Sequence, residues 1–291
     1  MIYREGMSGQ DSQHGYFTAD GQVYTPTAWS RSLWAPGILS GPPVCGLLAR
    51  EIESRYLTEG FAPARYTVDL HQPVPAVPVS VTCELTRDGN RIRAVTAVLH
   101  ADGEPVARAT ATLLKRSIQP PGELWRSDTE PPLPPRRLLD EVTPPTHLFG
   151  SDAGWSVAMS GHQNTSRKRK WVRNIPVVAG CESSPFCYAV MAAEQASLVT
   201  NWGTEGIGFI NADVSVNFSR QPVAAEMGIE AAQHFSADGI AAGGAVLYDE
   251  QGPFALCTVS ALANERRQIS GAVIDEFIPN RGTAEWVGRH G

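Results

Sequence analysis

The chain has 291 residues, of which 42% are hydrophobic and 19% charged, a composition that suits about two globular domains with substantial cores. Its net charge of −6 argues against a nucleic-acid partner and against an anionic membrane surface. The sequence contains no run of about 18 apolar residues and no apolar signal segment, so we expect no membrane span and no signal peptide.

The first half of the chain is predicted to be one helix followed by an antiparallel sheet. Residues 43–48, PVCGLL, open a helical pattern with proline in its first turn. The strand YTVDLHQPV at 66–74 has apolar residues at alternate positions. Turn signals at 87–90 and 101–105 separate further strands, of which PVARATATL (105–113) is the last. This order indicates an α+β unit.

A proline-rich stretch then divides the chain nearly in half. Eight prolines fall between Pro120 and Pro145. Proline removes a backbone donor and fixes φ, so a stretch of this kind can hold neither a helix nor a central strand. We therefore predict an extended linker.

The second half repeats the first. The segment PFCYAV at 185–190 corresponds to PVCGLL and again opens a helix with proline. The alternating strand VSVNFSRQPV at 214–223 ends, like its counterpart, in Gln-Pro-Val. Turn signals at 237–239 and 249–253 follow, and PFALCTVSA (253–261) corresponds to PVARATATL. The chain is therefore predicted to contain the same α+β unit twice.

The second predicted helix, YAVMAAEQASLVTNW at 188–202, contains one carboxylate on an otherwise apolar stripe. Steps of four residues define that stripe as Phe186, Val190, Glu194, Leu198 and Trp202. In the first half the corresponding stripe has Ile52 where the second has Glu194. A buried, unpaired carboxylate is expensive, so the chain must supply partners or use the group. We expect Ile52 to be core and Glu194 to face a pocket; the alternative is a structural glutamate at the stripe edge, reaching solvent or an arginine.

Several stretches resemble the bacterial acyl-CoA thioesterase II family: ELTRDGNRIRAV (84–95), KWVR (170–173), EGIGF (205–209) and NFSRQP (217–222). The resemblance implies an α+β double hot-dog fold, in which each of two repeats wraps an antiparallel β-sheet around a long central helix. The expected divisions are an N-terminal extension (1–27), hot-dog unit 1 (28–118), a Pro-rich linker (119–165), hot-dog unit 2 (166–264) and a C-terminal tail (265–291).

The resemblance also implies an activity and a site. Members hydrolyse an acyl thioester to the free acid and CoA, and counting back from the GIGF motif places their catalytic aspartate at Glu194. Their water-orienting threonine falls near Asn211 and their glutamine at Ser260, and neither residue type is kept. The amide of Asn211 and the hydroxyl of Ser260 can still orient a water. The alternatives are a strand-entry turn residue at Asn211, a backbone-bonded Ser260, and a catalytically weak acyl-thioester-binding protein.

Other chemistry finds little support in the residues. The seven histidines show no metal-ligand spacing and no G-x-S-x-G motif occurs, so we expect no metal, no organic cofactor and no serine nucleophile. The five cysteines lack CxxC spacing and are predicted to be reduced, mostly buried thiols of a cytoplasmic protein. The basic run SRKRK (166–170) is interpreted as a solvated face or linker end in preference to a site for CoA phosphates. The expected partner is an acyl-CoA substrate, and homo-oligomerisation is left open.

Overall fold

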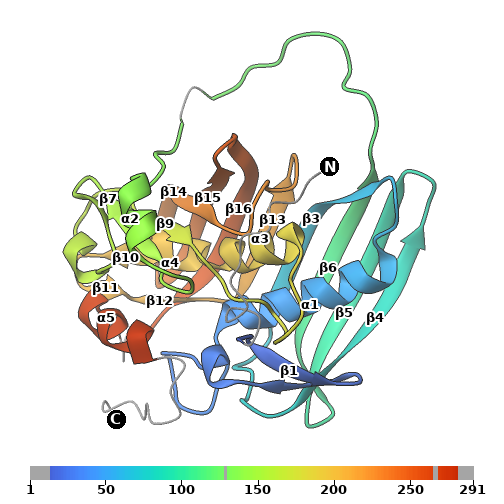
Figure 1. Ribbon diagram of the computed structural model, residues 1–291, viewed down its shortest axis with the longest axis horizontal. Helices are drawn as coiled ribbons and strands as arrows, with labels where there is room; N and C mark the ends of the chain where they lie inside the picture. Colours follow the sequence, from blue (N-terminus) through green and yellow to red (C-terminus); the bar gives the residue numbers. More distant parts are fainter. Residues whose placement is uncertain (1–13, 128–129, 265–267, 281–291) are drawn as a thin grey trace.

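The computed structural model describes residues 14–127, 130–264 and 268–280, and in them one antiparallel sheet of 14 strands forms most of the molecule (Figure 1). From edge to edge the strands are β1 (Phe17–Asp20), β2 (Val23–Pro26), β4 (Val79–Asp88), β5 (Ile92–Ala101), β6 (Glu104–Lys115), β3 (Phe61–Leu70), β13 (Asp213–Phe218), β16 (Gly252–Ala263), β15 (Ile240–Asp249), β14 (Met227–Ala237), β9 (Arg169–Val172), β7 (Leu148–Ser151) and β8 (Gly154–Ser156); β12 (Phe209–Asn211) also pairs with β16. The strands β10 (Trp202–Gly203) and β11 (Gly206–Ile207) form a separate short hairpin.

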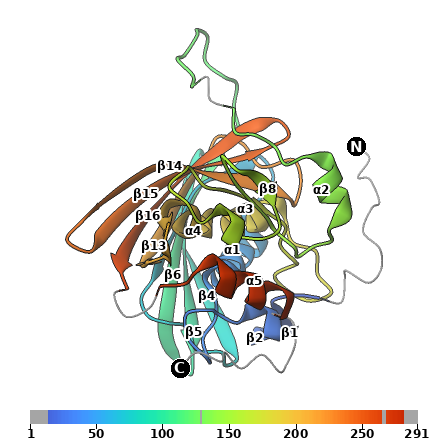
Figure 2. The same cartoon turned by 90° about the vertical axis from the view of Figure 1, so that its left-hand side faces the viewer.

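The main helices lie on one face of this sheet (Figures 1 and 2). Helix α1 (Gly41–Tyr56) packs on β4, β5 and β6 of the first half. Helices α3 (Pro185–Glu194) and α4 (Ala196–Asn201) pack on β13 to β16 of the second half. The prolines predicted for the first turns are present in both α1 and α3, and the Ser184 side chain caps α3 by accepting the N–H of Cys187.

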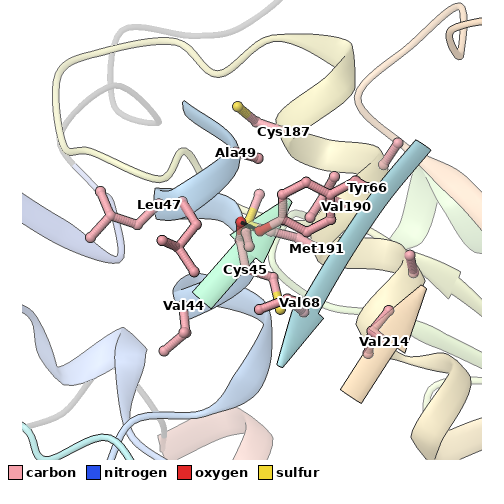
Figure 3. Close-up of a cluster of buried hydrophobic side chains, with 14 of the residues drawn as sticks. Val44, Cys45, Leu47, Ala49, Tyr66, Val68, Cys187, Val190, Met191 and Val214 are labelled. Carbon is pink, nitrogen blue, oxygen red and sulfur yellow. Dashed lines mark hydrogen bonds between the residues drawn. The ribbon is translucent and has the colours of Figure 1, made fainter. Parts of the chain in front are cut away.

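The core lies between these helices and the sheet, where α1 and α3 also contact each other. Figure 3 shows side chains of α1, α3, β3 and β13 meeting there. A methyl group on Gly46 of α1 would lie 2.8 Å from Cγ of Met191 on α3, so this glycine sets the close approach of the two helices. The hydroxyl of Tyr66 on β3 donates to the carbonyl of Cys45 at 2.9 Å, which ties the sheet to α1.

The two halves join at their sheets, through β3 and β13. These strands are antiparallel, and Thr67 lies opposite Ser215 with the two hydroxyl oxygens 2.7 Å apart. In the sequence repeat Thr67 corresponds to Ser215, so the junction pairs a position with its own counterpart. The strand order is symmetric about it: β3-β6-β5-β4 on one side and β13-β16-β15-β14 on the other.

Three regions that were expected to be peripheral contain regular elements. The region 1–27 supplies β1 and β2, which extend the sheet beyond β4. The region 119–165 contains α2 (Arg136–Glu141), β7, β8 and the 3-10 helix η3 (Ser160–His162), while residues 116–127 are exposed and carry no helix or strand (Figure 1). The region 265–291 contains α5 (Gly271–Asn280). Residues 1–13, 128–129, 265–267 and 281–291 of these regions lie outside the described residues.

The prediction that no helix forms between Pro120 and Pro145 is wrong at α2. The six residues RRLLDE of this helix fall in a gap between prolines, and Pro135 is its N-cap. Because a proline at the start of a helix leaves every hydrogen bond inside it intact, the helix forms.

The helix predicted through 188–202 is interrupted. α3 ends at Glu194, Gln195 separates it from α4, and Trp202 already belongs to β10. The N–H of Gln195 donates to the carbonyl of Ala192, three residues back, at 3.0 Å, which tightens the last turn. Neither glycine nor proline occurs at this point, so the residue pattern contains no signal for the break.

The basic run at 166–170 is not a solvated face. Lys168 and Lys170 are 2% and 5% exposed, and the guanidinium of Arg169 pairs with Glu230 at 2.8 Å. The interpretation of the run as a solvated face is therefore wrong for both lysines. The run leads into β9, where alternate residues point to opposite faces, and both lysines point inward.

Within the described ranges no helix is long and apolar enough to cross a membrane. The five cysteines are all free, and Cys45, Cys187 and Cys257 are buried. Burial is the state in which a thiol behaves as a small apolar side chain.

Candidate active site

A cavity of about 620 Å³ lies where the two halves meet. It is lined by the N-terminus of α1, the break between α3 and α4, β12 and α5. Apolar side chains in its lining include those of Trp34, Ile210, Leu262, Ile274, Phe277 and Ile278. Polar and charged residues in the lining include Lys170, Glu194, Gln195 and Asn211. Apolar walls with a few converging polar groups are typical of a small-molecule site.

Glu194 is the last residue of α3, and its side chain lines this cavity. The residue is 8% exposed, so the carboxylate does not extend into open solvent, which was one form of the structural alternative. Its Oε2 accepts a hydrogen bond from Nε2 of Gln195 at 2.9 Å, and its Oε1 accepts one from Nδ2 of Asn211 at 3.4 Å. Such donors favour the ionised form of a buried carboxylate.

The first turn of α1 lies directly against this carboxylate. A methyl group on Gly41 would lie 2.1 Å from Oε1 and 2.4 Å from Cδ of Glu194, so any larger residue requires the carboxylate to move. The next two residues, Pro42 and Pro43, have no N–H, and the N–H of Ser40 donates to Ser30. Gly41 therefore carries the single backbone donor of the first three residues of α1. The positive end of the helix dipole lies at the same point.

Lys170 on β9 approaches Glu194 through one amide. Its Nζ donates to Oε1 of Gln195 at 2.5 Å, and Gln195 in turn donates to Glu194. Sequence reasoning singled out neither residue for the site. Gln195 lies off the apolar stripe of an uninterrupted helix, and Lys170 was grouped with a basic run. The inward alternation of Lys168 and Lys170 before Val172 is a signal that would have found the lysine.

Of the two predicted water-orienting residues, the structure brings only Asn211 to Glu194. Ser260 is exposed on β16, whereas its neighbours Val259 and Ala261 are buried. Ser260 is not among the residues that line the cavity. Its backbone N–H donates to Oδ1 of Asp213 at 2.9 Å. No contact between Ser260 and Glu194 supports the expected role in orienting water, and that role stays a prediction.

Two buried cysteines lie near the carboxylate. Burial raises the pKa of the Cys45 and Cys257 thiols well above the ordinary value, and the negative charge of Glu194 raises both further. Both thus remain neutral thiols, which are poor nucleophiles. Among the residues that the structure describes, no group of three or more His, Cys, Asp or Glu side chains could hold a metal ion.

Comparisons with known proteins give one family and one fold. The model of the acyl-CoA thioesterase N-terminal domain matches residues 30–114, and that of the C-terminal domain matches residues 126–263. No curated protein sequence matches the chain significantly.

Three solved structures illustrate the likeness in fold. A conserved protein of unknown function with a hot-dog fold from Alicyclobacillus acidocaldarius is 15% identical with a TM-score of 0.62, over 90% of this chain and 100% of that one. The tesB protein of Mycobacterium avium subsp. paratuberculosis is 15% identical with a TM-score of 0.59, over 85% and 96%. The acyl-CoA thioesterase II of Mycobacterium marinum is 15% identical with a TM-score of 0.56, over 89% and 99%. The likeness shows a hot-dog fold.

Proposed function

The chain belongs to the acyl-CoA thioesterase family, and from this premise we propose that it hydrolyses an acyl-CoA to the free acid and CoA with Glu194 as the general base. Members of the family are thioester hydrolases. The observation that carries the proposal is the buried Glu194 carboxylate, which lines a cavity against the N-terminus of α1. A desolvated carboxylate beside a helix N-terminus offers a base and an oxyanion donor at one place.

The same proposal includes the architecture. The two halves, 28–118 and 166–264, are two hot-dog units in one chain, each with its own helix on its own four long strands. The symmetric strand order about β3 and β13 supports this division. In this arrangement β1 and β2 extend the first unit, and β7, β8 and β9 extend the second.

The substrate fits the cavity in one orientation. Its acyl chain lies along the apolar side, against β12 and α5, where burial of each methylene contributes about 0.8 kcal/mol. The thioester carbonyl then lies beside Glu194 and Gly41, because the proposed base and the Gly41 backbone donor are adjacent in the cavity lining. Each unit supplies one of the two groups, so the site belongs to the junction of the halves.

The chemistry needs one water molecule. Glu194 takes a proton from the water while the oxygen of the water attacks the carbonyl carbon. Asn211 holds that water through its amide. The Gly41 N–H donates to the carbonyl oxygen as it becomes an oxyanion. When the tetrahedral intermediate collapses, the carbon–sulfur bond breaks and the CoA sulfur takes the proton from Glu194. The products are a carboxylic acid and CoA, and Glu194 is ionised again.

The second candidate function is acyl-thioester binding with little hydrolysis. The position of Ser260 favours it, because the residue at the family's glutamine position lies outside the cavity. A binding protein needs the apolar wall and the Gly41 donor but no activated water. Turnover by the unmodified protein separates this function from the first.

Glu194→Gln is the direct test. The amide keeps the shape of the side chain but cannot take a proton, so hydrolysis should fall by roughly 10²–10⁴-fold. Binding of a non-hydrolysable acyl-CoA thioether should change little, and the melting temperature should stay level or rise, because a neutral amide replaces a desolvated carboxylate. Release of free thiol from acetyl-, octanoyl- and palmitoyl-CoA measures turnover.

Glu51→Gln is the matched control. Glu51 is a 5% exposed glutamate on α1 that accepts from Tyr24 at 2.6 Å and pairs with Arg55 at 2.7 Å. Its substitution should lower stability and leave turnover per folded molecule unchanged. A Glu194→Gln protein that melts early yet hydrolyses normally contradicts the proposal. Absence of turnover in the parent, together with tight thioether binding, supports the binding protein.

A further inference from the structure

A buried lysine is connected to the candidate base through a single amide. Lys170 on β9 is 5% exposed, and its ammonium donates to Oε1 of Gln195 at 2.5 Å. Nε2 of Gln195 donates to Oε2 of Glu194 at 2.9 Å. Two consecutive hydrogen bonds therefore lead from a cation to a carboxylate.

The lysine determines which end of the amide faces Glu194. A lysine ammonium has three donors and no acceptor, so the oxygen of Gln195 must face Lys170. The amide nitrogen is thereby turned toward Glu194 as a donor. A donor on a carboxylate favours its ionised form, and the ionised form is the one that can accept a proton from water.

The break between the helices makes this contact available. In an uninterrupted helix two consecutive side chains point in directions about 100° apart. Here α3 ends at Glu194 and α4 begins at Ala196, so Gln195 occupies a turn of its own and its amide reaches the preceding carboxylate. Lys170 contacts the face of the Phe149 ring as well, with its Nζ 5.4 Å from the ring centre. This contact fixes the direction from which the ammonium approaches.

We infer that Lys170 is a positioning residue, which locks the Gln195 amide so that it donates to Glu194 and keeps this base ionised. The inference rests on the proposed function. In the absence of the lysine the amide can rotate by half a turn and present its oxygen to Glu194. When the amide oxygen of Gln195 faces Glu194, the carboxyl group of Glu194 retains its proton. A protonated Glu194 cannot activate water.

Lys170→Met tests the inference through the pH dependence of hydrolysis. The acid limb of kcat/KM should move upward by about one pH unit, because the protonated form of the base becomes more favourable. On the acid limb the variant should be about tenfold slower than the parent, whereas on the plateau above it the two rates should converge. Other titratable or charged groups near Glu194 or in its cavity are the same in both proteins: Cys45 of α1, Cys257 of β16, Arg31, His71 after β3 and His147 before β7.

Three further variants separate positioning from simple structural loss. Lys170→Arg should restore the parent limb, since a guanidinium also only donates. Gln195→Leu should shift the limb as Lys170→Met does, and the double variant should add nothing further. Lys168→Met is the matched control, because Lys168 is as buried and donates to Asn164 and Ser166 instead. It should lower the melting temperature and leave the limb in place.

The possible outcomes decide between the proposals. A Lys170→Met protein that loses activity equally at every pH, or keeps the parent limb, overturns the positioning role. If Lys170→Met does not fold, the limb of Gln195→Leu decides in its place. Loss of activity in Glu194→Gln with an unmoved limb in Lys170→Met removes only this inference. No hydrolysis by the parent removes the proposed function and this inference together.

Discussion

Glu194 and Gly41 come from opposite halves of the chain, and the space between them is too small for a methyl group. The backbone of Gly41 does not require glycine, because its φ is not in the left-handed region. The requirement is steric. Because Gly41 has no side chain, its backbone N–H can lie close both to the base and to the reacting carbonyl. A larger residue would push these groups apart.

Gly41→Ala should therefore reduce hydrolysis more than stability. The new methyl group must displace the Glu194 carboxylate, and a displacement of about 1 Å at reacting groups costs on the order of 10²-fold in rate. Overpacking should cost about 1–3 kcal/mol in the free energy of unfolding. Steady-state kinetics and urea unfolding measure the two effects.

Gly203→Ala is the control for this change. Gly203 is exposed, has an ordinary φ, and has open space where its methyl group would lie. Its substitution should change neither turnover nor stability noticeably. Gly41→Ala with the turnover of the parent would show that the first turn of α1 does not contribute to the reaction.

Among single residues, the sequence predicts those that stand out when its two repeats are compared. Glu194 stood out because the sister half has Ile52, and the structure places Glu194 at a cavity while Ile52 is fully buried. Its catalytic role remains a proposal. The contact between Lys170 and Gln195 could not be predicted, since it depends on a helix break that has no proline or glycine to mark it, although alternation in the sequence points the lysine inward. For Ser260 the sequence indicates a position along a strand but not the face to which its side chain points, and its role stays a prediction.

The helix α5 forms part of the apolar wall and is attached by its polar groups. The carboxylate of Asp275 accepts the N–H groups of Met159 and Ser160 at 2.5 and 3.0 Å, and Gly271 donates to Gln163 at 2.7 Å. These bonds hold α5 against η3, so Ile274 and Phe277 face the cavity. A wall attached in this way limits the length of apolar chain that the cavity accepts.

Phe277→Ala should lengthen the preferred acyl chain. The ring is 4% exposed and lines the cavity, and its removal leaves room for additional methylenes. The ratio of kcat/KM for palmitoyl-CoA to that for octanoyl-CoA should rise about tenfold, the scale of one or two extra buried methylenes. The loss of packing should cost about 3–5 kcal/mol of stability.

Val273→Ala on the same helix separates the two effects. Val273 is a residue of α5 that packs against the neighbouring hydrophobic core but does not line the cavity. Its substitution should reduce stability and leave the chain-length ratio unchanged. If both variants alter the ratio equally, mobility of α5 rather than the volume of the Phe277 ring determines the preference.

The sequence was most informative where elements are local. The hairpin turns follow from Asp-Gly pairs, and Asp102-Gly103 and Asp238-Gly239 all have the positive φ that a two-residue turn of this kind needs. The predicted strands 105–113 and 253–261 lie within β6 and β16, whereas those at 66–74 and 214–223 overlap β3 and β13 but extend beyond the ends of these strands at Leu70 and Phe218. The joining of β1, β2, β7 and β8 to the sheet could not be predicted, because short strands pair through backbone groups that every sequence has. The helix α5 could not be predicted either, because its apolar face is explained only by the cavity that it lines.

The whole molecule is organised about the pairing of β3 with β13. Strands on either side follow the same order, and the inner face carries α1 in the first half and α3 with α4 in the second. The two halves differ at the position that Ile52 occupies in α1 and Glu194 in α3. One half therefore uses this position for packing, while the other uses it for the site.

Ile52→Ala should lower stability and leave the chemistry intact. The side chain is fully buried and does not line the cavity, so its truncation should cost about 2–5 kcal/mol. Ile92→Ala, at a 36% exposed position on β5, should cost less than about 0.5 kcal/mol. Guanidinium unfolding and kcat per folded molecule measure these effects. A main effect of Ile52→Ala on turnover, at unchanged stability, would contradict the asymmetry.

The junction at Thr67 and Ser215 has a consequence for how such a molecule can change over generations. In an assembly of identical chains, one codon sets the residue at both symmetric positions, so every substitution is made twice. Here the two positions are encoded separately. A mutation can remove the charge from one helix and leave it on the other, as isoleucine at 52 and glutamate at 194 illustrate. Because both halves are translated as one chain, they are always made in equal amounts. The site requires both halves, since Glu194 lies in one and its neighbour Gly41 in the other.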